Sequence, residues 1–400
     1  MPGIGISNAI PFNKGVSWSS YWATRTPTDL YAVVYRDTEA DLAWTDASAG
    51  EVPFRVYIST DGVNYTEAGT TLAGDTTYTA TGLTAGTLYY FYVKAYSGTN
   101  ESPASNVWDT YFKITVDTTK AGSADTHFVL PVTAKSAAAY YVDWGDGGAE
   151  EEFTTTGNKD HTYASSGTYQ VKVRGGLTAL AFNNAGDKLK LMSIDQWGDI
   201  AWSSMTLAFR GCSNLSGTYL DNPNTAAVTD MSYMFSGCAA FNQSIANFNT
   251  AAVTTMYAMF NGCSAFNQSI ANFNTAAVTT MFAMFSGCAA FNQSVANFNT
   301  AAVTDMSHMF SGCSAFKQSL ATFSLASVTD VSNMLLSCNI NATGTTTNYD
   351  DTLVAWAAAD VPNSLNFHGG TSKYSAATGA AARASLIADD LWTITDGGQA

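Results

Sequence analysis

A long, nearly exact internal repeat constrains this chain more than any other feature. The segment Asn224–Phe248, NTAAVTDMSYMFSGCAAFNQSIANF, recurs with few changes at 249–273, 274–298 and 299–323. A fixed period of this length is typical of a solenoid, in which each repeat buries its apolar side only by stacking on its neighbours. We therefore predict an elongated scaffold that displays a surface for binding. Five cysteines mark the period: Cys238, Cys263, Cys288, Cys313 and Cys338.

Composition narrows the class of protein. The chain has 400 residues, of which 12% are charged and 46% hydrophobic, so several domains with cores are expected. Its net charge is -15 with only 17 Lys and Arg, which argues against nucleic-acid binding because phosphate neutralisation needs clustered cations. A surface rich in Ser, Thr, Asn and Gly, with few charges, is typical of extracellular or virion proteins.

The N-terminal sequence MPGIGISNAIPFNKGVSWSSYW does not have the basic segment and apolar core of a secretory signal peptide. No run of 18 apolar residues predicts a membrane span. If the protein works outside a cell, we expect another carrier. One route out of the cell is a virion that is released by lysis. The other route is a cleaved precursor or a specialised secretion system.

Residues 28–112 alternate apolar and polar positions in short runs separated by turns, which predicts an antiparallel sandwich. Leu42 and Trp44 are expected to face inward, and Asp61-Gly62 provides a tight turn. The stretch GLTAGTLYYFYVKA resembles the fibronectin type III signature, which implies a tyrosine corner. The residues that carry this resemblance, together with the core Trp44, are Leu83, Tyr89, Phe91 and Val93.

Residues 113–176 form a second β segment with runs such as FKITVD and GTYQVKVRGG. Three motifs resemble the PKD-type immunoglobulin-like domain, namely Trp144–Gly147, His161–Tyr163 and Gly167–Val171. The acidic residues Asp143, Asp146 and Glu150 to Glu152 raise the option of calcium. Calcium needs six to eight oxygen ligands in one cage, so we favour an acidic turn and predict no metal site.

Two patterns lie within each repeat. Val228, Met231, Met234, Phe235 and Cys238 stand at offsets 0, 3, 6, 7 and 10, the spacing of one helix face. Thr225 is placed to cap this helix and Gly237 to end it. The following run, residues 241–248, predicts a strand with its turns. Stacking would give a parallel sheet on one side and short helices on the other, as in a leucine-rich-repeat horseshoe or rod.

The repeats also resemble a known family. AFRGCSNL at 208–215 and MFSGCAAF at 234–241 resemble the signature of BspA-like leucine-rich repeats, and VTDMSYMF with FNQSIANF is similar to a bacterial surface-protein repeat. The resemblance runs from about Leu189 to Asn341. It implies adhesion to proteins, carbohydrates or host surfaces, with no catalytic residues. This chain has Phe248-Asn249 where that family commonly has Trp and Asp, so contacts made by those groups do not carry over.

All six cysteines lie in the repeat region. Zinc sites need paired ligands separated by two to four residues, whereas each of these thiols lies a whole repeat away from the next. Equivalent residues of stacked repeats come close enough for a disulfide, but their Cβ atoms point in parallel directions. We predict a buried ladder of free thiols and no cofactor.

The positions that vary between repeats indicate a binding surface. The copies differ most at Ser232-Tyr233 and the equivalent pairs, while the core positions barely change. We expect an exposed aromatic ladder suited to stacking on sugars or packing against a partner, with drift on a tolerant surface as the alternative. Asn242, Gln243 and Asn247, which recur in the first three copies, either form a rival binding surface or hydrogen-bond to the backbone of the turns. The predicted ligand-binding residues are Tyr233, Tyr257, Phe282 and His308.

These observations predict a multidomain protein, with two all-β immunoglobulin-like sandwiches followed by an α/β leucine-rich-repeat solenoid and a C-terminal cap. No catalytic motif occurs, and the four histidines are scattered, so we predict no enzyme. The predicted parts are an N-terminal attachment arm (1–27), a fibronectin type III-like domain (28–112), a PKD-like sandwich (113–176), the solenoid (177–345) and the cap (346–400).

The N-terminus resembles the starts of virion proteins in phages of Bacteroidetes-type hosts. We therefore predict a phage tail, fibre or capsid-decorating protein on the particle surface, bound to other virion proteins through its arm and to a host surface protein or glycan. Nucleic acid and membrane insertion are not expected, and homo-oligomerisation is left open. The alternatives are a BspA-like adhesin on a bacterial cell surface and a purely structural virion component.

Overall fold

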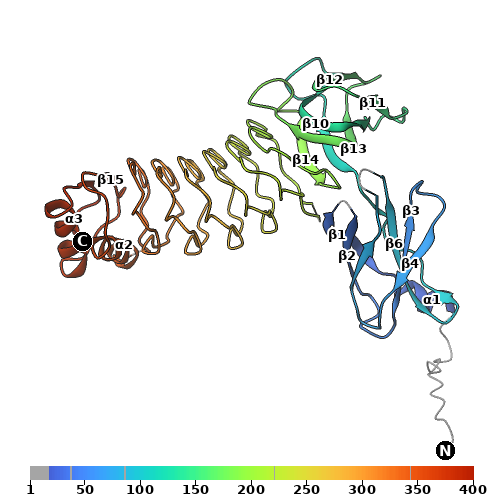
Figure 1. Ribbon diagram of the computed structural model, residues 1–400, viewed down its shortest axis with the longest axis horizontal. Helices are drawn as coiled ribbons and strands as arrows, with labels where there is room; N and C mark the ends of the chain where they lie inside the picture. The colour runs from blue at the N-terminus through green and yellow to red at the C-terminus, as the bar shows by residue number, and fades with distance from the viewer. Residues whose placement is uncertain (1–17, 37, 85–86, 220, 343) are drawn as a thin grey trace, which may run out of the picture. The chain divides into compact units, whose positions relative to one another are not determined.

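The computed structural model describes residues 18–36, 38–84, 87–219, 221–342 and 344–400. The chain divides into two compact units, Met1–Thr110 and Tyr111–Ala400 (Figure 1). Most of the predicted attachment arm, residues 1–17, lies outside the described residues. Its described end includes helix α1 (Trp18–Ala23). No helix among the described residues is long and apolar enough to cross a membrane.

The first unit contains two antiparallel sheets. One has the order β1-β2-β5, and the other has the order β4-β3-β6-β7 with β8 also paired to β6. Their inward residues form one core in which Trp44 packs edge-on against Phe54, with ring centroids 5.4 Å apart. The strands are β1 (Thr28–Arg36), β2 (Glu39–Thr45), β3 (Phe54–Ser59), β4 (Thr66–Thr70), β5 (Thr77–Thr81), β6 (Tyr90–Ser97), β7 (Asn100–Glu101) and β8 (Trp108–Asp109).

The residues predicted to shape this core take the expected places. Leu42 and Trp44 are buried, as are Phe91 and Val93. The hydroxyl of Tyr89 accepts a hydrogen bond from the backbone N–H of Thr84 at 3.0 Å, which is the contact a tyrosine corner makes. The alternation of apolar and polar residues was therefore sufficient to predict which of these side chains face the core.

The second unit begins with a six-stranded sheet in the order β11-β10-β13-β9-β14, with β12 paired to β10. Within it Trp144 stacks on His161 at 4.8 Å, and the Tyr163 hydroxyl donates to the Trp144 carbonyl at 3.0 Å. The predicted PKD-type motifs thus meet in space, while the family resemblance itself stays a prediction. The strands are β9 (Phe112–Asp117), β10 (His127–Asp143), β11 (Glu151–Phe153), β12 (Gly157–Thr162), β13 (Thr168–Leu180) and β14 (Leu191–Gln196).

This sheet and the repeats share one continuous core. The boundary predicted at residue 177 falls inside β13, and β14, which we had assigned to the solenoid, pairs with β9. A single cluster of buried apolar residues runs from Phe112 to Ile394. The sheet therefore covers the first end of the repeat stack instead of forming a separate module.

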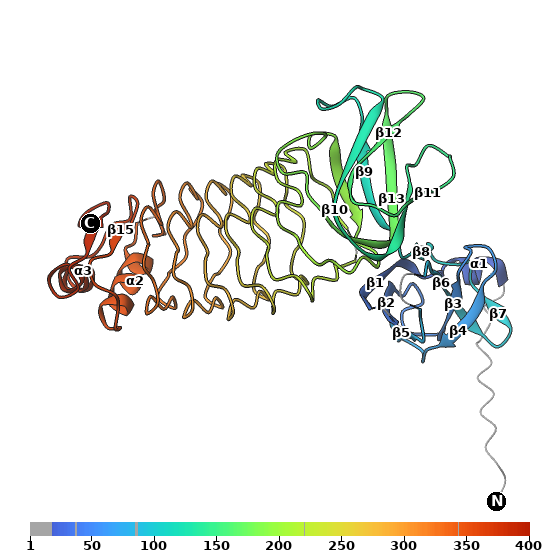
Figure 2. The same cartoon turned by 45° about the horizontal axis from the view of Figure 1, so that its top comes forward.

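The repeats form a stack of coils, each of which we call a rung (Figure 2). The described residues of the rungs contain no α-helix, so the prediction of an α/β leucine-rich-repeat solenoid is wrong. Residues 232–237 form consecutive turns instead, and Asp230 makes an isolated parallel β-bridge to Thr255 of the next rung. Residues 241–248 do not form the predicted strand. They end in another turn, in which the N–H of Phe248 donates to the carbonyl of Ile245 at 3.1 Å.

Alternating hydrogen bonds explain why these turns replace a helix. The N–H of Tyr233 donates to the carbonyl of Tyr257 in the next rung at 2.8 Å, whereas the N–H of Met234 closes a turn to Met231 at 3.2 Å. A residue with positive φ in each rung reverses the local direction of the chain, and this conformation is incompatible with a continuing right-handed helix. These residues are Tyr233, Ala258, Ala283, His308 and Asn333, with φ values of 56°, 50°, 49°, 57° and 54°.

Gly237 and Thr225 also differ from their predicted helical roles. Gly237 has φ 78°, a left-handed conformation that favours glycine. Thr225 does not cap a helix. Its hydroxyl donates to the Asn249 carbonyl of the next rung at 2.9 Å, a bond that the equivalent Thr250, Thr275 and Thr300 repeat.

A cap covers the far end of the stack (Figure 1). Leu353, Trp356 and Leu386 are buried against the last rungs, and the N–H of Leu335 donates to the His368 carbonyl at 3.0 Å. Ile387 of the same cap is exposed. The cap contains α2 (Thr347–Ala357), β15 (Asn366–His368), α3 (Thr378–Ala388) and β16 (Thr393–Thr395), and its two strands pair in parallel.

Candidate functional site

The four predicted ligand-binding residues form one continuous column along the stack. Ring centroids are 5.1 Å apart for Tyr233 and Tyr257, 4.5 Å for Tyr257 and Phe282, and 5.9 Å for Phe282 and His308. All four side chains are half-buried. We call these residues the aromatic column.

The column is continuous although its members do not occupy equivalent positions in the repeat. Tyr233 and His308 are the residues with positive φ in their rungs, whereas Tyr257 and Phe282 precede such a residue. In the rungs of Tyr257 and Phe282, the residue with positive φ is a buried alanine, for example Ala258. Two kinds of rung therefore place an aromatic side chain on the same line.

Polar groups close both ends of the column. The guanidinium of Arg210 lies over the Tyr233 ring, 4.6 Å from its centroid, which is the geometry of a cation–π contact. At the other end the Nδ2 of Asn333 lies 3.3 Å from the Nε2 of His308. Sequence reasoning missed Arg210, because this residue belongs to the irregular first copy of the repeat. The cysteine of that copy, Cys212, lies 26 positions before Cys238, whereas the later cysteines are 25 positions apart.

The column offers ring edges and hydroxyls more than ring faces. Tyr257 and Phe282 are 19° from coplanar, so they cover part of each other's faces. The edge of an aromatic ring is the positive part of its quadrupole. Burial, together with the neighbouring Tyr233, raises the pKa of Tyr257 to about 12, so its hydroxyl is neutral at physiological pH. The geometry therefore favours edge contacts and hydrogen bonds over the sugar stacking that the sequence suggested.

The rival polar surface consists largely of ladders that satisfy the backbone. The Oδ1 of Asn242 accepts the N–H of Asn267 at 2.9 Å and the Nε2 of Gln268 at 3.1 Å in the next rung. The Nε2 of Gln243 donates to the Ser216 carbonyl at 2.7 Å. Asn272, the equivalent of Asn247, donates to the Ala246 carbonyl at 3.1 Å. These side chains stabilise the stack, as their second interpretation predicted.

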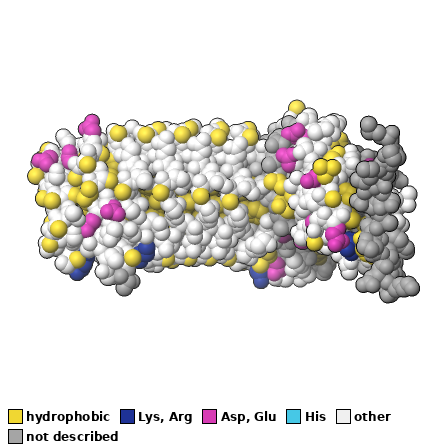
Figure 3. Space-filling view, turned by 90° about the horizontal axis from the view of Figure 1, so that it is seen from below, with side chains coloured by type: hydrophobic (Ala, Val, Ile, Leu, Met, Phe, Trp, Pro, Cys, Tyr) yellow, Lys and Arg dark blue, Asp and Glu magenta, His cyan; other side chains and the backbone are white. Residues whose placement is uncertain are grey.

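The middle of the stack carries no charge. Residues 231–304 contain no Asp, Glu, Lys or Arg. On the face that Figure 3 shows, charged side chains gather toward the two ends, and rows of apolar side chains run between them. A ligand of the column would therefore meet neutral donors, acceptors and apolar edges.

The six thiols form the predicted ladder. All are free and buried. Each of the five periodic thiols donates to the carbonyl of a phenylalanine in the preceding rung, for example Cys238 to Phe209 at 3.0 Å. They are core groups that pair the rungs.

The acidic turn of the second unit is held by protein partners. Asp143 accepts the N–H of Gly145 and the Nζ of Lys172, both at 2.9 Å. Asp146 accepts the N–H of Gly148 at 3.0 Å, which lowers its pKa. Glu150 pairs with Arg174. Within the described part of the chain no cluster of three metal-binding side chains is found.

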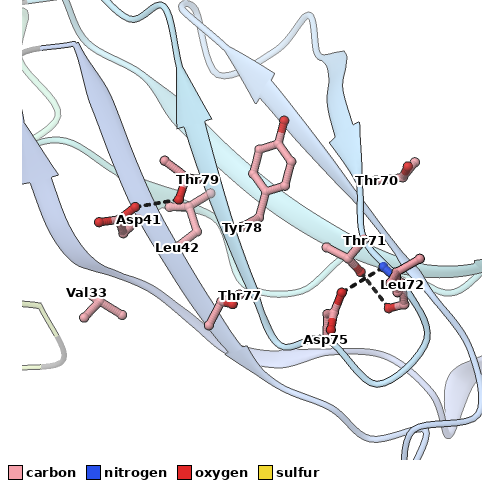
Figure 4. A pocket seen from close by; sticks show the side chains of 10 residues that line it. All are labelled: Val33, Asp41, Leu42, Thr70, Thr71, Leu72, Asp75, Thr77, Tyr78 and Thr79. Atoms are coloured by element: carbon pink, nitrogen blue, oxygen red, sulfur yellow. Dashed lines mark hydrogen bonds between the residues drawn. The ribbon is translucent and has the colours of Figure 1, made fainter.

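Figure 4 shows an open cavity of about 680 Å³ in the first unit, lined by residues of β2, β4 and β5. Its two carboxylates are engaged locally. Asp41 accepts the Thr79 hydroxyl at 2.7 Å, and Asp75 accepts the N–H of Leu72 at 3.0 Å.

A buried polar clamp was not predicted from sequence. The Nζ of Lys190, fully buried, donates to the carbonyls of Ala124 and His127 at 2.8 and 2.7 Å. Asp187 accepts the N–H groups of Ser123 and Val129 at 2.6 and 2.8 Å. The clamp ties two loops of the sheet together, and no local motif distinguishes these residues from surface charges.

Comparisons with known proteins agree with this modular architecture. Residues 16–110 match the fibronectin type III domain family. Three overlapping segments, residues 179–274, 203–294 and 247–349, match a family described as "Mycoplasma protein of unknown function, DUF285". The chain thus combines a region similar to fibronectin type III domains with a region similar to DUF285 repeats. The DUF285 match supports the BspA-like nature of these repeats.

Solved structures similar to the chain include an Fn3-like protein from Clostridium thermocellum, with 35% sequence identity. The similarity covers 22% of this chain and 91% of that one, with a TM-score of 0.20. A two-domain fibronectin type III segment from chicken tenascin is 17% identical over 37% of this chain and 89% of that one, with a TM-score of 0.20. No curated protein shows significant sequence similarity to the chain.

Proposed function

We propose that this chain is a non-enzymatic surface protein of the adhesion type, in which the repeat stack presents the aromatic column to a protein or glycan on another surface. The observation that carries this proposal is the alignment of Tyr233, Tyr257, Phe282 and His308 from four successive rungs. Aromatic side chains are enriched at binding hot spots, and a rigid row costs little entropy to order.

Two carriers are compatible with this function. The phage virion hypothesis rests on the N-terminal sequence, most of which lies outside the described residues. The family matches support a surface adhesion protein, and a bacterial cell-surface adhesin fits them at least as well. Mass spectrometry of purified virions and of washed bacterial envelopes separates the two, because the chain is found in one fraction or the other.

The test replaces Tyr233, Tyr257 and Phe282 together with alanine in the full chain. We expect fluorescently labelled protein to lose at least about tenfold in affinity for its target cells, since each hot-spot aromatic contributes about 1–2 kcal/mol or more. Flow cytometry against a panel of candidate hosts measures the loss.

A matched control changes exposed residues outside the column, Ala276→Ser and Ala301→Ser. The control is expected to bind like the wild type. Equal binding by the column variant and the wild type, on cells that bind the wild type, would reject the column as the binding face and leave the purely structural alternative.

A further inference from the structure

An open groove of about 700 Å³ lies where the last rungs meet the cap, and Lys317 and Lys373 both line it. We propose that this groove binds an oxyanion, that is, the carboxylate, sulfate or phosphate group of a ligand. This site lies apart from the aromatic column and does not depend on the function proposed for it.

The groove is a built part of the fold. The Nδ2 of Asn341, a buried side chain, donates to the Lys373 carbonyl at 2.8 Å. The Nδ2 of Asn348 donates to the carbonyls of Lys317 and Ile340, both at 2.8 Å. These bonds join the backbones of the rung, the connecting loop and the cap, so they fix the two lysine backbones relative to each other.

The groove carries more positive than negative charge, because two lysines and one carboxylate, that of Ala400, line it. Among the described residues, no Asp or Glu side chain lines the groove. Neither lysine forms an ion pair with a described residue, and this holds for the carboxylate of Ala400 as well. By contrast, Arg383 of the same cap pairs with Asp396 at 2.8 Å. In a chain of net charge -15, two unpaired cations in one groove favour an anionic ligand.

Lys317 departs from the repeat pattern only in its side chain. The three preceding rungs have asparagine at this position, namely Asn242, Asn267 and Asn292. The backbone N–H of Lys317 still donates to the Oδ1 of Asn292 at 2.8 Å, so the ladder is intact. Its Nζ donates to the Asn339 carbonyl. An ammonium group has three donors, so two N–H groups are left for a ligand.

The start of helix α2 forms part of the groove wall. Thr347, the first helical residue, and Thr346, its N-cap, both line the groove. Thr346 makes no side-chain capping bond, because its hydroxyl donates to Asp350 at 2.8 Å. The N-terminal end of a helix carries a partial positive charge, which the carboxylate of Asp350 in the first turn offsets here, so the two lysines remain the cationic groups of the groove.

Lys317→Asn and Lys373→Ala test the proposal in the full chain. Sulfate, phosphate and acetate are titrated separately against chloride at constant ionic strength, and the backbone amide resonances of Thr347 and of the residue at position 373 report binding. We expect saturable shifts in the wild type and a loss of about tenfold in affinity in each variant, since one charge-assisted hydrogen bond is removed. The anion that binds most tightly identifies the acidic group.

Lys135→Ala, at a half-buried lysine of β10, is the matched control and should bind like the wild type. Lys317→Asn restores the residue of the other rungs, so its melting temperature in chloride should stay close to that of the wild type. Shifts that do not saturate, or equal affinities in the wild type and both groove variants, would overturn the proposal. Unaltered cell binding by the groove variants would leave the aromatic column hypothesis intact.

Discussion

The thiol of Cys263 donates a hydrogen bond to the carbonyl oxygen of Phe235, 3.0 Å away in the preceding rung. The same carbonyl accepts the backbone N–H of Cys238 at 2.9 Å. Cysteine therefore recurs because a small, buried side chain with a donor fits this place. The bond links rung to rung inside the core, where no water can replace it.

This arrangement predicts unreactive thiols. Burial raises the pKa of Cys263 well above its ordinary value, so almost no reactive thiolate forms at neutral pH. In the native protein we expect none of the six thiols to react with a chromogenic disulfide reagent within minutes, and all six to react after unfolding in denaturant. Rapid labelling of any native thiol, located by peptide mass spectrometry, would contradict the burial of the ladder.

Because Ala258 is the residue with positive φ in its rung, we expect substitutions there to affect stability in an unusual order. Glycine at this position removes a strained conformation, so Ala258→Gly should be neutral or stabilise the protein by up to about 1 kcal/mol. Ala258→Val should cost about 2 kcal/mol or more, because a β-branched residue is disfavoured there and Ala258 is buried.

Calorimetric melting temperatures measure both changes. Ala276→Gly, at an exposed position without positive φ, is the control and should lower stability by up to about 1 kcal/mol. If Ala258→Gly destabilises as much as this control, position 258 does not carry the proposed backbone strain.

The burial of Asp221, at the first end of the stack, predicts that the free energy of unfolding depends on pH. It is 2% exposed and accepts the N–H groups of Trp197 and Gly198 at 2.9 and 2.7 Å. Burial raises its pKa to about 6, above the value near 4 of an unfolded chain. Its stabilising contribution is thus present below about pH 4 and is lost as the pH rises through about 6, a change on the order of 3 kcal/mol.

Asp221→Asn removes this titration and provides the comparison. Between pH 4 and 6 the free energy of unfolding of the wild type should fall relative to that of the variant, because in this range the folded wild type keeps a proton at Asp221 that the unfolded chain has lost. Denaturation in urea at several pH values measures the difference. Parallel pH profiles for the two proteins would show that Asp221 titrates alike in the folded and unfolded chains.

The repeat core could be predicted from sequence, but its backbone could not. Val228, Met231, Met234, Phe235 and Cys238 are all buried, as their spacing predicted. A helix and a series of turns with the same three- and four-residue spacing bury the same side chains. The choice is made by hydrogen bonds to the next rung, which a single repeat does not contain. Asn at position 333, which tolerates positive φ, was the one local signal of the turn.

The candidate site was predictable to a similar degree. Variation between repeats selected Tyr233, Tyr257, Phe282 and His308, and the structure places them together. The sequence did not show that the rings stack on one another, because Tyr233 and Tyr257 hold different positions within their repeats. The contact of Arg210 with Tyr233 also depends on the irregular first rung.

The bonds between rungs have a consequence for how such a gene changes over time. The N–H of Tyr233 reaches the carbonyl of Tyr257, and the N–H of Ala258 reaches that of Phe282, so in both cases the acceptor lies one position short of a full repeat beyond its donor. Unequal recombination that adds or removes one whole repeat joins surfaces that already fit. Lineages can therefore lengthen or shorten the stack, and the aromatic column with it, while the sheet and the cap continue to close its ends.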